Sequence, residues 1–315
     1  MHEVRGGATE GFETWTLSSP GGEIEATFVP KAGMLGCSLR HRGEELLHLG
    51  GGVTEYVRTR AVAGIPLLHP WANRLACFEF AFAGRKVAVD RDSELVTLDP
   101  NGLPIHGLLT GSALWNVASA HADARTATLT AELDFGAHEL LLRAFPFPHL
   151  LRMQVELADS ALTVRTTVAP SGESAVPISF GFHPYLRLPG IDRRQWEIEL
   201  PVRAQLVLDD QMIPTGATEP VEFPPAALGD RHFDDGFSEL VPGAPFVLSG
   251  GGRTVRVAFL KDYPYAQVYS PPGASFICFE PMTAPTNALC EGAALPIVLP
   301  GDTFSASFRI DISSA

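Results

Sequence analysis

A glutamate follows one of the most apolar short segments of the chain. Residues 275–279 are SFICF, and Glu280 and Pro281 come directly after them. Burial in apolar surroundings destabilises the charged form of a carboxyl group and raises its pKa toward the range of a useful general base. A surface glutamate at a strand edge is the alternative, but an apolar run rarely ends in an unpaired acid without a reason. We therefore predict a strand that delivers a catalytic carboxylate at its end.

A histidine interrupts a second strand-like segment. This segment, PISFGFHPYLRLPG at 177–190, begins like a strand and must break at His183, Pro184 and Tyr185. An imidazole can donate or accept a proton near neutral pH, which suits it to general acid or base catalysis. From this motif alone, a packed loop histidine is an equally good interpretation.

Three further motifs place polar side chains among loop-forming residues. GIPLLHPWANRL carries Asn73 and Arg74, and the guanidinium has a fixed fork of donors that suits hydroxyl groups. LPIHGLL carries His106 before a glycine, and HFDDGFSEL carries Asp234 and Asp235 before another. Taken singly, each motif favours a structural role: an arginine bonded to loop carbonyls, a histidine bonded to backbone, and a solvated Asp-Gly turn.

Alternation of apolar and polar residues predicts β-strands along the whole chain. In 303–312, TFSASFRIDI, every second residue is apolar, which is the period of a half-buried strand. The same pattern predicts strands at 23–28, 126–133, 162–168, 196–200 and 254–259. The 30 glycines and 26 prolines gather in turn-like clusters between such runs. We predict an all-β sandwich or barrel with one domain over 1–315.

The composition excludes several classes of partner. The chain has 315 residues, of which 45% are hydrophobic, and a formal net charge of -13. Such an acidic surface repels phosphate backbones and anionic lipids, so we expect neither nucleic acid nor membrane as a partner. The N-terminal residues lack the apolar core of a signal peptide, and no run of about 18 apolar residues would span a bilayer. We therefore expect a cytoplasmic location.

The four cysteines predict no cross-link. They are Cys37, Cys77, Cys278 and Cys290, widely spaced and without a CxxC pair. Their neighbours are apolar, as in FICFE. We predict buried, reduced thiols in preference to a zinc site or disulfides.

The order of the motifs resembles that of the aldose 1-epimerase (galactose mutarotase-like) family. The sequence has PWANRL, IHG, GFHPYLRLPG, DDGF, AQVYSPPG and FEPMTAPTNAL in this order, from about residue 20 onward. GFHPYLRLPG and FEPMTAPTNA are the specific pieces. The resemblance implies a large single-domain β-sandwich, the supersandwich of that family.

The resemblance also implies roles for individual residues. Glu280 matches the family's catalytic base, and His183 matches its catalytic acid. The implied substrate-binding residues are Asn73, Arg74, His106, Asp234 and Gln267. Asp235 replaces Asp234 if the register of that loop differs by one. SPPG stands where several galactose-type members have TGN, and DDGF lacks their DH pair, so galactose is not implied as the substrate.

The implied reaction interconverts the α and β anomers of an aldose, with an aldohexose as the expected substrate. A base removes the proton of the C1 hydroxyl, an acid protonates the ring oxygen, the C1–C2 bond rotates, and the ring closes on the other face. No electrons move and nothing is hydrolysed, so we expect no cofactor and no metal, and the sequence has neither a GxGxxG nor a P-loop motif. We expect a monomer or a homodimer.

Three other functions stay open from the sequence. A metal site would combine His106, His183 and Glu280, although these residues lack a short ligand spacing. A non-catalytic sugar sensor would use the same pocket, because fold does not fix function. A mutarotase for sugar phosphates would need a basic cluster near PWANRL, where Arg85 and Lys86 are the nearest candidates in sequence.

Overall fold

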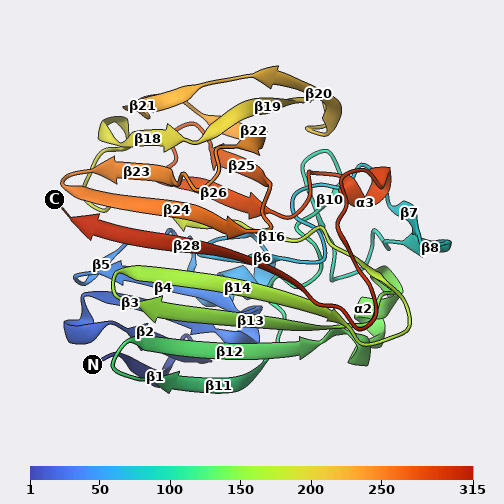
Figure 1. The fold of residues 1–315 in the computed structure, drawn as a ribbon, viewed down its shortest axis with the longest axis horizontal. Helices are drawn as coiled ribbons and strands as arrows, with labels where there is room; N and C mark the ends of the chain where they lie inside the picture. Colours follow the sequence, from blue (N-terminus) through green and yellow to red (C-terminus); the bar gives the residue numbers. More distant parts are fainter. Residues whose placement is uncertain (315) are drawn as a thin grey trace.

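β-strands dominate the computed structural model, which describes residues 1–314 (Figure 1). Within these residues the α-helices are short: α1 (Gly52–Thr59), α2 (Glu139–Ala144) and α3 (Ala288–Glu291). Single 3₁₀ turns cover Pro20–Gly22, Pro30–Ala32, Phe135–Ala137 and Arg193–Gln195. The prediction of an all-β sandwich is confirmed.

A nine-stranded antiparallel sheet forms one layer, which lies at the front in Figure 1. Its spatial order is β11 (Asn116–Ala122), β12 (Thr126–Asp134), β13 (His149–Ala158), β14 (Ala161–Pro170), β28 (Phe304–Ser314), β24 (Arg253–Lys261), β23 (Phe246–Gly250), β18 (Glu197–Leu200) and β21 (Phe223–Ala227). The strand β28, from the end of the sequence, therefore lies in the interior of the sheet, between β14 and β24.

Two sheets form the second layer. The N-terminal sheet contains β1 (Glu3–Thr9), β2 (Phe12–Ser18), β3 (Ile24–Val29), β4 (Leu35–His41) and β5 (Glu44–Glu45). The eight-stranded sheet has the order β20 (Pro214–Pro220), β19 (Val202–Leu208), β22 (Phe233–Leu240), β25 (Tyr265–Ser270), β26 (Ile277–Met282), β16 (Gly181–Phe182) and β6 (Leu67–Leu68), with β17 (Tyr185–Leu186) also paired to β26.

Backbone hydrogen bonds join these two sheets into one continuous surface. The N–H of His48 donates to the carbonyl oxygen of Tyr185 over 2.9 Å, and the N–H of Arg187 donates to that of Leu46 over 2.9 Å. The segment after β5 thus pairs with β17, which itself pairs with β26. Three small ladders lie elsewhere: β7 (Glu79–Phe82) with β8 (Arg85–Ala88), β9 (Thr97–Leu98) with β10 (Pro104–Ile105), and β15 (Val176–Pro177) with β27 (Ile297–Val298).

The apolar faces of the two layers meet in one core that extends from Leu17 to Ile312 in sequence. Ring contacts cross the interface: the ring centroid of Phe182 on β16 lies 5.0 Å from that of Phe308 on β28. Because side chains alternate along a strand, each strand of the second layer turns its other face away from this core. Polar and catalytic-type side chains on that outer face are therefore free to meet a ligand.

The alternation patterns located the strands well. The six segments named from alternation correspond to β28, β3, β12, β14, β18 and β24. Two local expectations were wrong. The strand that carries Glu280 continues through Met282, because β26 pairs with β25 as far as Tyr265. The DDGF segment lies within β22 and is not a turn, because it pairs with β25.

The prediction of four reduced thiols is also wrong. Cys77 and Cys290 form a disulfide across 213 residues of sequence. The physical reason is local: Asn287, just before α3, accepts a hydrogen bond from the N–H of Ala76 and donates its own N–H to the carbonyl oxygen of Arg74. These bonds hold α3 against the segment before β7. The two free cysteines, both buried, are Cys37 and Cys278.

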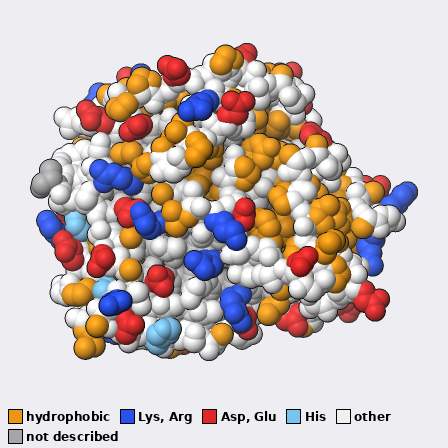
Figure 2. Space-filling model, in the orientation of Figure 1, with side chains coloured by type: hydrophobic (Ala, Val, Ile, Leu, Met, Phe, Trp, Pro, Cys, Tyr) orange, Lys and Arg blue, Asp and Glu red, His pale blue; other side chains and the backbone are white. Residues whose placement is uncertain are grey.

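The outer face of the nine-stranded sheet is shown in Figure 2. Apolar side chains gather right of its centre, and side chains of both charges are spread over the rest. Among residues 1–314, no helix is long and apolar enough to cross a membrane. The one-domain organisation of 1–315 stays a prediction.

Candidate active site

A cavity of about 420 Å³ opens on the outer face of the eight-stranded sheet. All seven residues that the sequence analysis named line it: Asn73, Arg74, His106, His183, Asp234, Gln267 and Glu280. They come from five separate parts of the chain, and the pairing of β22, β25 and β26 brings Asp234, Gln267 and Glu280 together. The structure therefore unites the predicted residues around one space.

Glu280 and His183 lie side by side and almost fully buried, with exposed fractions of 1% and 4%. Glu280 is on β26, and His183 follows β16, which pairs with β26. The Oε1 atom of Glu280 is 3.1 Å from the Nε2 atom of His183. Their alignment is nevertheless not that of a hydrogen bond, and within residues 1–314 neither carboxylate oxygen has a hydrogen-bond partner. A buried carboxyl group without hydrogen-bond partners destabilises the fold. This arrangement is therefore suited to a polar ligand that donates hydrogen bonds to the Glu280 oxygens.

Burial shifts the proton affinities of this pair in opposite directions. Burial, and then the negative charge of Asp234, raises the pKa of Glu280 well above its ordinary value, and Arg74 partly offsets this. Burial, and then the neighbouring His106, lowers the pKa of His183 well below its ordinary value. Gaining a second proton or losing the only one would each leave a net charge in a buried site. We therefore expect the pair to hold one proton between them over a wide pH range around neutrality.

Arg74 is held by three neighbours. Its Nε donates to Asp99 over 2.8 Å, and one terminal nitrogen donates to Oδ1 of Asn73 over 3.0 Å. The other terminal nitrogen lies 3.6 Å from Oδ2 of Asp234, whose Oδ1 accepts a hydrogen bond of 2.7 Å from Gln267. This network fixes both the orientation of the guanidinium and that of the Asp234 carboxylate. The result is a rigid array of donors and acceptors on one wall of the cavity.

The structure decides between Asp234 and Asp235. On β22, Asp234 faces the cavity, whereas Asp235 does not line it. The side chain of Asp235 accepts a hydrogen bond from Gln205 on β19, 2.7 Å away. Neighbouring residues of a strand point to opposite faces, so only one of the two can reach the site.

His106 occupies a backbone conformation that few residues adopt. Its φ is 64°, in the left-handed region, and its N–H donates to the carbonyl oxygen of Asn73 over 3.0 Å. Gly107 follows with a φ of 72°, and a Cβ there would collide with the backbone of His69. Burial, and then Arg74, lowers the pKa of His106 to about 3. At neutral pH this imidazole is therefore uncharged and acts as a hydrogen-bonding group.

The cavity also contains residues that the sequence analysis did not assign. These include Arg60, Asp99 and Tyr269. Tyr269 follows Gln267 by two residues on β25, so strand periodicity could have identified it. Asp99 lies in the turn DPNG and Arg60 at the end of α1, where no pattern pointed to a site.

Of the aromatic residues in the PWANRL and FHPY motifs, Tyr185 lines the cavity and Trp71 does not. The ring of Tyr185 stacks on that of His183, with centroids 4.5 Å apart and an interplanar angle of 9°. Trp71 is instead fully buried in the core between the layers. In the part of the chain that the structure describes, no group of three His, Cys, Asp or Glu side chains is arranged to hold a metal ion.

Solved structures of similar fold cover nearly the whole chain. A galactose mutarotase-like protein from Clostridium acetobutylicum has a TM-score of 0.86 at 17% identity, covering 100% of this chain and 99% of that one. Galactose 1-epimerase from Lactobacillus acidophilus has a TM-score of 0.80 at 15% identity, with coverage of 100% and 99%. A protein from Synechocystis sp. PCC 6803 has a TM-score of 0.77 at 22% identity, with 96% of each chain covered. At these identities the likeness shows a shared fold.

Sequence comparison gives the family. No curated protein sequence matches the chain. The model of the aldose 1-epimerase family, however, matches residues 32–311, which is most of the sequence. The all-β fold and this match together show that the chain belongs to the aldose 1-epimerase family.

Proposed function

We propose that this protein is an aldose 1-epimerase that acts on an unphosphorylated aldose, with Glu280 as the base and His183 as the acid. One observation carries the proposal: two buried groups with oppositely shifted pKa values lie 3.1 Å apart in a cavity whose walls carry fixed hydrogen-bonding groups. The substrate's C1 hydroxyl and ring oxygen are both attached to C1, so adjacent base and acid groups can reach both.

The reaction needs only the one proton that the pair holds. In the reactive form Glu280 is ionised and His183 is protonated. Glu280 takes the proton of the C1 hydroxyl, the C1–O5 bond breaks, and O5 takes the proton of His183. The pair then holds its proton on Glu280, the C1–C2 bond rotates, and closure on the other face returns both groups to their starting state.

The remaining residues would fix the other hydroxyl groups of the sugar. Arg74 and Gln267 have donors that their neighbours hold in place, and Asp234 has an oriented acceptor. Donors and acceptors that are already oriented lose little conformational freedom on binding. This supports recognition of a neutral, hydroxyl-rich ligand.

The arginines of the cavity weigh against a phosphorylated substrate. Arg74 is engaged with Asp99 and Asn73. Arg60 donates both terminal nitrogens to the backbone carbonyl oxygens of Glu94 and Leu108. A phosphate group would have to displace one of these partners, so we assign the cavity to a neutral sugar ring.

The buried carboxyl group weighs against a protein that only binds sugar. Keeping Glu280 buried without a hydrogen-bond partner destabilises the fold, and binding alone would be served by a neutral amide of the same size. A proton acceptor, in contrast, gains from the raised pKa. This favours turnover over sensing.

Exchange NMR at anomeric equilibrium tests the proposal directly. We expect the protein to accelerate α–β exchange of at least one aldohexose, and Glu280→Gln to reduce that rate by about 10²–10⁴-fold. Glu139→Gln, at an exposed glutamate of α2, is the matched control and should keep the native rate. If no aldose in a panel exchanges faster with the protein than without it, the proposal is wrong.

A further inference from the structure

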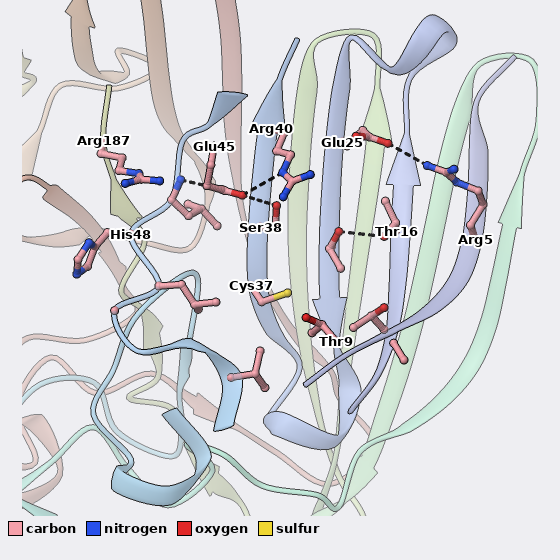
Figure 3. A pocket seen from close by; sticks show the side chains of 17 residues that line it. Arg5, Thr9, Thr16, Glu25, Cys37, Ser38, Arg40, Glu45, His48 and Arg187 are labelled. Atoms are coloured by element: carbon pink, nitrogen blue, oxygen red, sulfur yellow. Dashed lines mark hydrogen bonds and ion pairs between the residues drawn. The ribbon is translucent and has the colours of Figure 1, made fainter. Parts of the chain in front are cut away.

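A second and larger cavity, of about 680 Å³, lies over the outer face of the N-terminal sheet (Figure 3). A cross-strand row of polar side chains forms its floor, in the order Arg5, Thr16, Thr27 and Ser38 on β1 to β4. The hydroxyl groups of Thr16 and Thr27 lie 2.9 Å apart and hydrogen-bond to each other. The floor is therefore a band of hydroxyl groups with a guanidinium at one edge.

Most charges in this cavity are already paired. Arg5 donates to Glu25 over 2.9 Å, and Nε of Arg40 lies 3.4 Å from Glu45. Figure 3 shows both pairs on the sheet, with Arg187 pointing toward them from the neighbouring segment. The paired groups leave no net charge for an ionic ligand.

Arg187 is the exception. This half-buried arginine follows β17 and lines the cavity, yet it has no carboxylate within 4.0 Å among the described residues. Its buried Nε also has no hydrogen-bond partner there. Uncompensated guanidinium groups bind carboxylates through two parallel hydrogen bonds. In a chain with a net charge of -13, carboxylates are plentiful, so an arginine in a cavity without a carboxylate partner is unusual and indicates that the partner is a ligand.

A smaller cavity of about 240 Å³ lies between this space and the candidate active site and shares wall residues with both. The wall residues that it shares with the active-site cavity are Ala61, Val62, Tyr185 and Tyr269. Those that it shares with the cavity over the N-terminal sheet are His48, Leu49 and Gly50. All three spaces lie along the joined outer surface of the second layer, and their shared walls lead us to treat them as one groove.

Aromatic rings follow the groove from the active site toward Arg187. The ring of His183 stacks on Tyr185, whose centroid is 4.9 Å from that of Phe276, and Phe276 stacks on His48 at 4.9 Å. Aromatic faces provide broad apolar contact, and the polar edges of a ring ligand stay free for hydrogen bonds. A strip of rings followed by a band of hydroxyl groups fits successive pyranose units.

We propose that the active-site cavity is one end of a substrate groove for an acidic oligosaccharide, and that Arg187 binds a carboxylate on a unit beyond the reducing end. The proposal rests on the proposed function, because the reducing end must occupy the cavity of Glu280 and His183. The alternative is the ordinary solvated face of an antiparallel sheet. This alternative does not explain why Arg187, which comes from a different segment, is unpaired. It also does not explain why the cavity over the N-terminal sheet adjoins the active site through shared wall residues.

Binding and turnover are measured separately with matched ligands. The ligands are cellobiose and cellotriose, each also with its non-reducing C6 oxidised to a carboxylate. Calorimetry uses the Glu280→Gln protein, which keeps the groove but lacks the base. We expect the acidic trisaccharide to bind at least about tenfold more tightly than the neutral one, as for a charge-assisted hydrogen-bonded pair. Arg187→Gln should abolish this preference, and Arg187→Lys, which keeps the charge, should retain part of it.

The control is Arg125→Gln, at an exposed arginine between β11 and β12, which changes the net charge equally and should keep the preference. Equal affinity for neutral and acidic forms, or an equal loss in both glutamine variants, would overturn the proposal. Trisaccharides that bind no better than glucose would mean that the face is only solvated. If Arg187-dependent binding persists while exchange NMR detects no turnover, the groove stands and the proposed enzymatic function fails.

Discussion

The active-site cavity and the part of the groove over the N-terminal sheet lie on the same outer surface, but the arginines of the two regions have different partners. Arg74 in the cavity is bound by Asp99 and Asn73 and lies near Asp234. Arg187 in the groove has no acidic partner among the described residues. A guanidinium that is already paired with a carboxylate offers oriented N–H donors to a neutral ligand. The positive charge of an unpaired guanidinium is neutralised only when an anion binds. The comparison indicates that the two regions recognise different parts of a ligand.

The two regions also differ in how deeply their ionisable groups lie. Glu280 and His183 are almost fully buried, and burial displaces both pKa values. The ion pairs of the groove, such as Arg5 with Glu25, are partly exposed, and such pairs contribute little to stability. Changes in the cavity should therefore alter activity and pH dependence strongly, and changes in the groove should alter ligand preference.

The largest expected effect comes from His183. His183→Asn removes the proton donor and should reduce anomer exchange by about 10²–10⁴-fold, because the ring oxygen then leaves unprotonated. The variant that combines it with Glu280→Gln should be little slower than the slower single variant, since the two groups act as one unit. Exchange NMR with a responsive aldose measures all three. Multiplicative losses in the double variant would contradict a shared proton.

The second effect is a loss of stability in acid. His69 and His149 lie in the core with their Nε2 atoms 2.9 Å apart, and burial lowers the pKa of His69 well below its ordinary value and that of His149 to about 4. The unfolded chain binds these protons near pH 6.5, whereas the folded chain does not. Stability should therefore fall as the pH decreases from about 6.5 toward 4, by up to about 1.4 kcal/mol per pH unit for each buried imidazole.

Urea unfolding at a series of pH values measures this slope. His106 adds to it, because burial lowers its pKa to about 3. His149→Asn, whose amide can keep the hydrogen bond to the carbonyl oxygen of Phe147, should flatten the slope. His121→Asn, at an exposed position on β11, should leave it as it is. A stability that does not change between pH 7 and 5 would contradict neutral buried imidazoles.

The third effect concerns the covalent tie beside the cavity. The disulfide between Cys77 and Cys290 anchors the segment that carries Arg74, whereas the groove has no such link among residues 1–314. Replacing both cysteines with serine should lower the free energy of unfolding by about 2–5 kcal/mol. A reducing agent should destabilise the native protein but not the variant. Disulfides are rare in the cytosol, so a reduced pair in freshly lysed, alkylated cells would fit the expected cytoplasmic location and an oxidised pair would contradict it.

The smallest effect separates positioning from catalysis. Asp99→Asn keeps an oxygen for the N–H groups of Asn101 and Leu103 but removes the charge that holds Arg74. We expect KM to rise roughly tenfold and kcat to change much less, because a charge-assisted hydrogen bond to a binding residue is lost. Asp209→Asn is the matched control. Asp209 accepts the same two kinds of backbone hydrogen bond in an exposed turn. An equal effect in both variants would remove Asp99 from the site.

Local patterns predicted much of the fold. Alternation over 303–312 predicted β28, and the apolar run before Glu280 predicted β26, because half-buried and buried strands impose their period on the sequence. The Asp-Gly pair of DDGF was taken for a turn, although pairing with β25 holds it in a strand. Propensity is local, and long-range pairing overrides it.

The candidate site residues could be predicted where several of them lie in one short motif. They could not be predicted where their contacts join residues far apart in the sequence. The motifs around His183 and Glu280 named residues that the structure brings together. Asp99 was missed because its turn looks like any other, and its contact with Arg74 spans 25 residues. The disulfide was missed because 213 residues separate its cysteines. Arg187 was missed because the absence of a carboxylate partner is visible only in the three-dimensional structure, and no sequence motif indicates it.

The position of β28 within the nine-stranded sheet has a consequence for biosynthesis. Until residues 304–314 have been made, β14 and β24 have no strand between them and each presents an unpaired edge. The nine-stranded sheet can therefore be completed only when nearly all of the sequence has left the ribosome. A nascent chain stalled before Phe304 would hold two incomplete half-sheets whose edges are open to chaperones or to other chains.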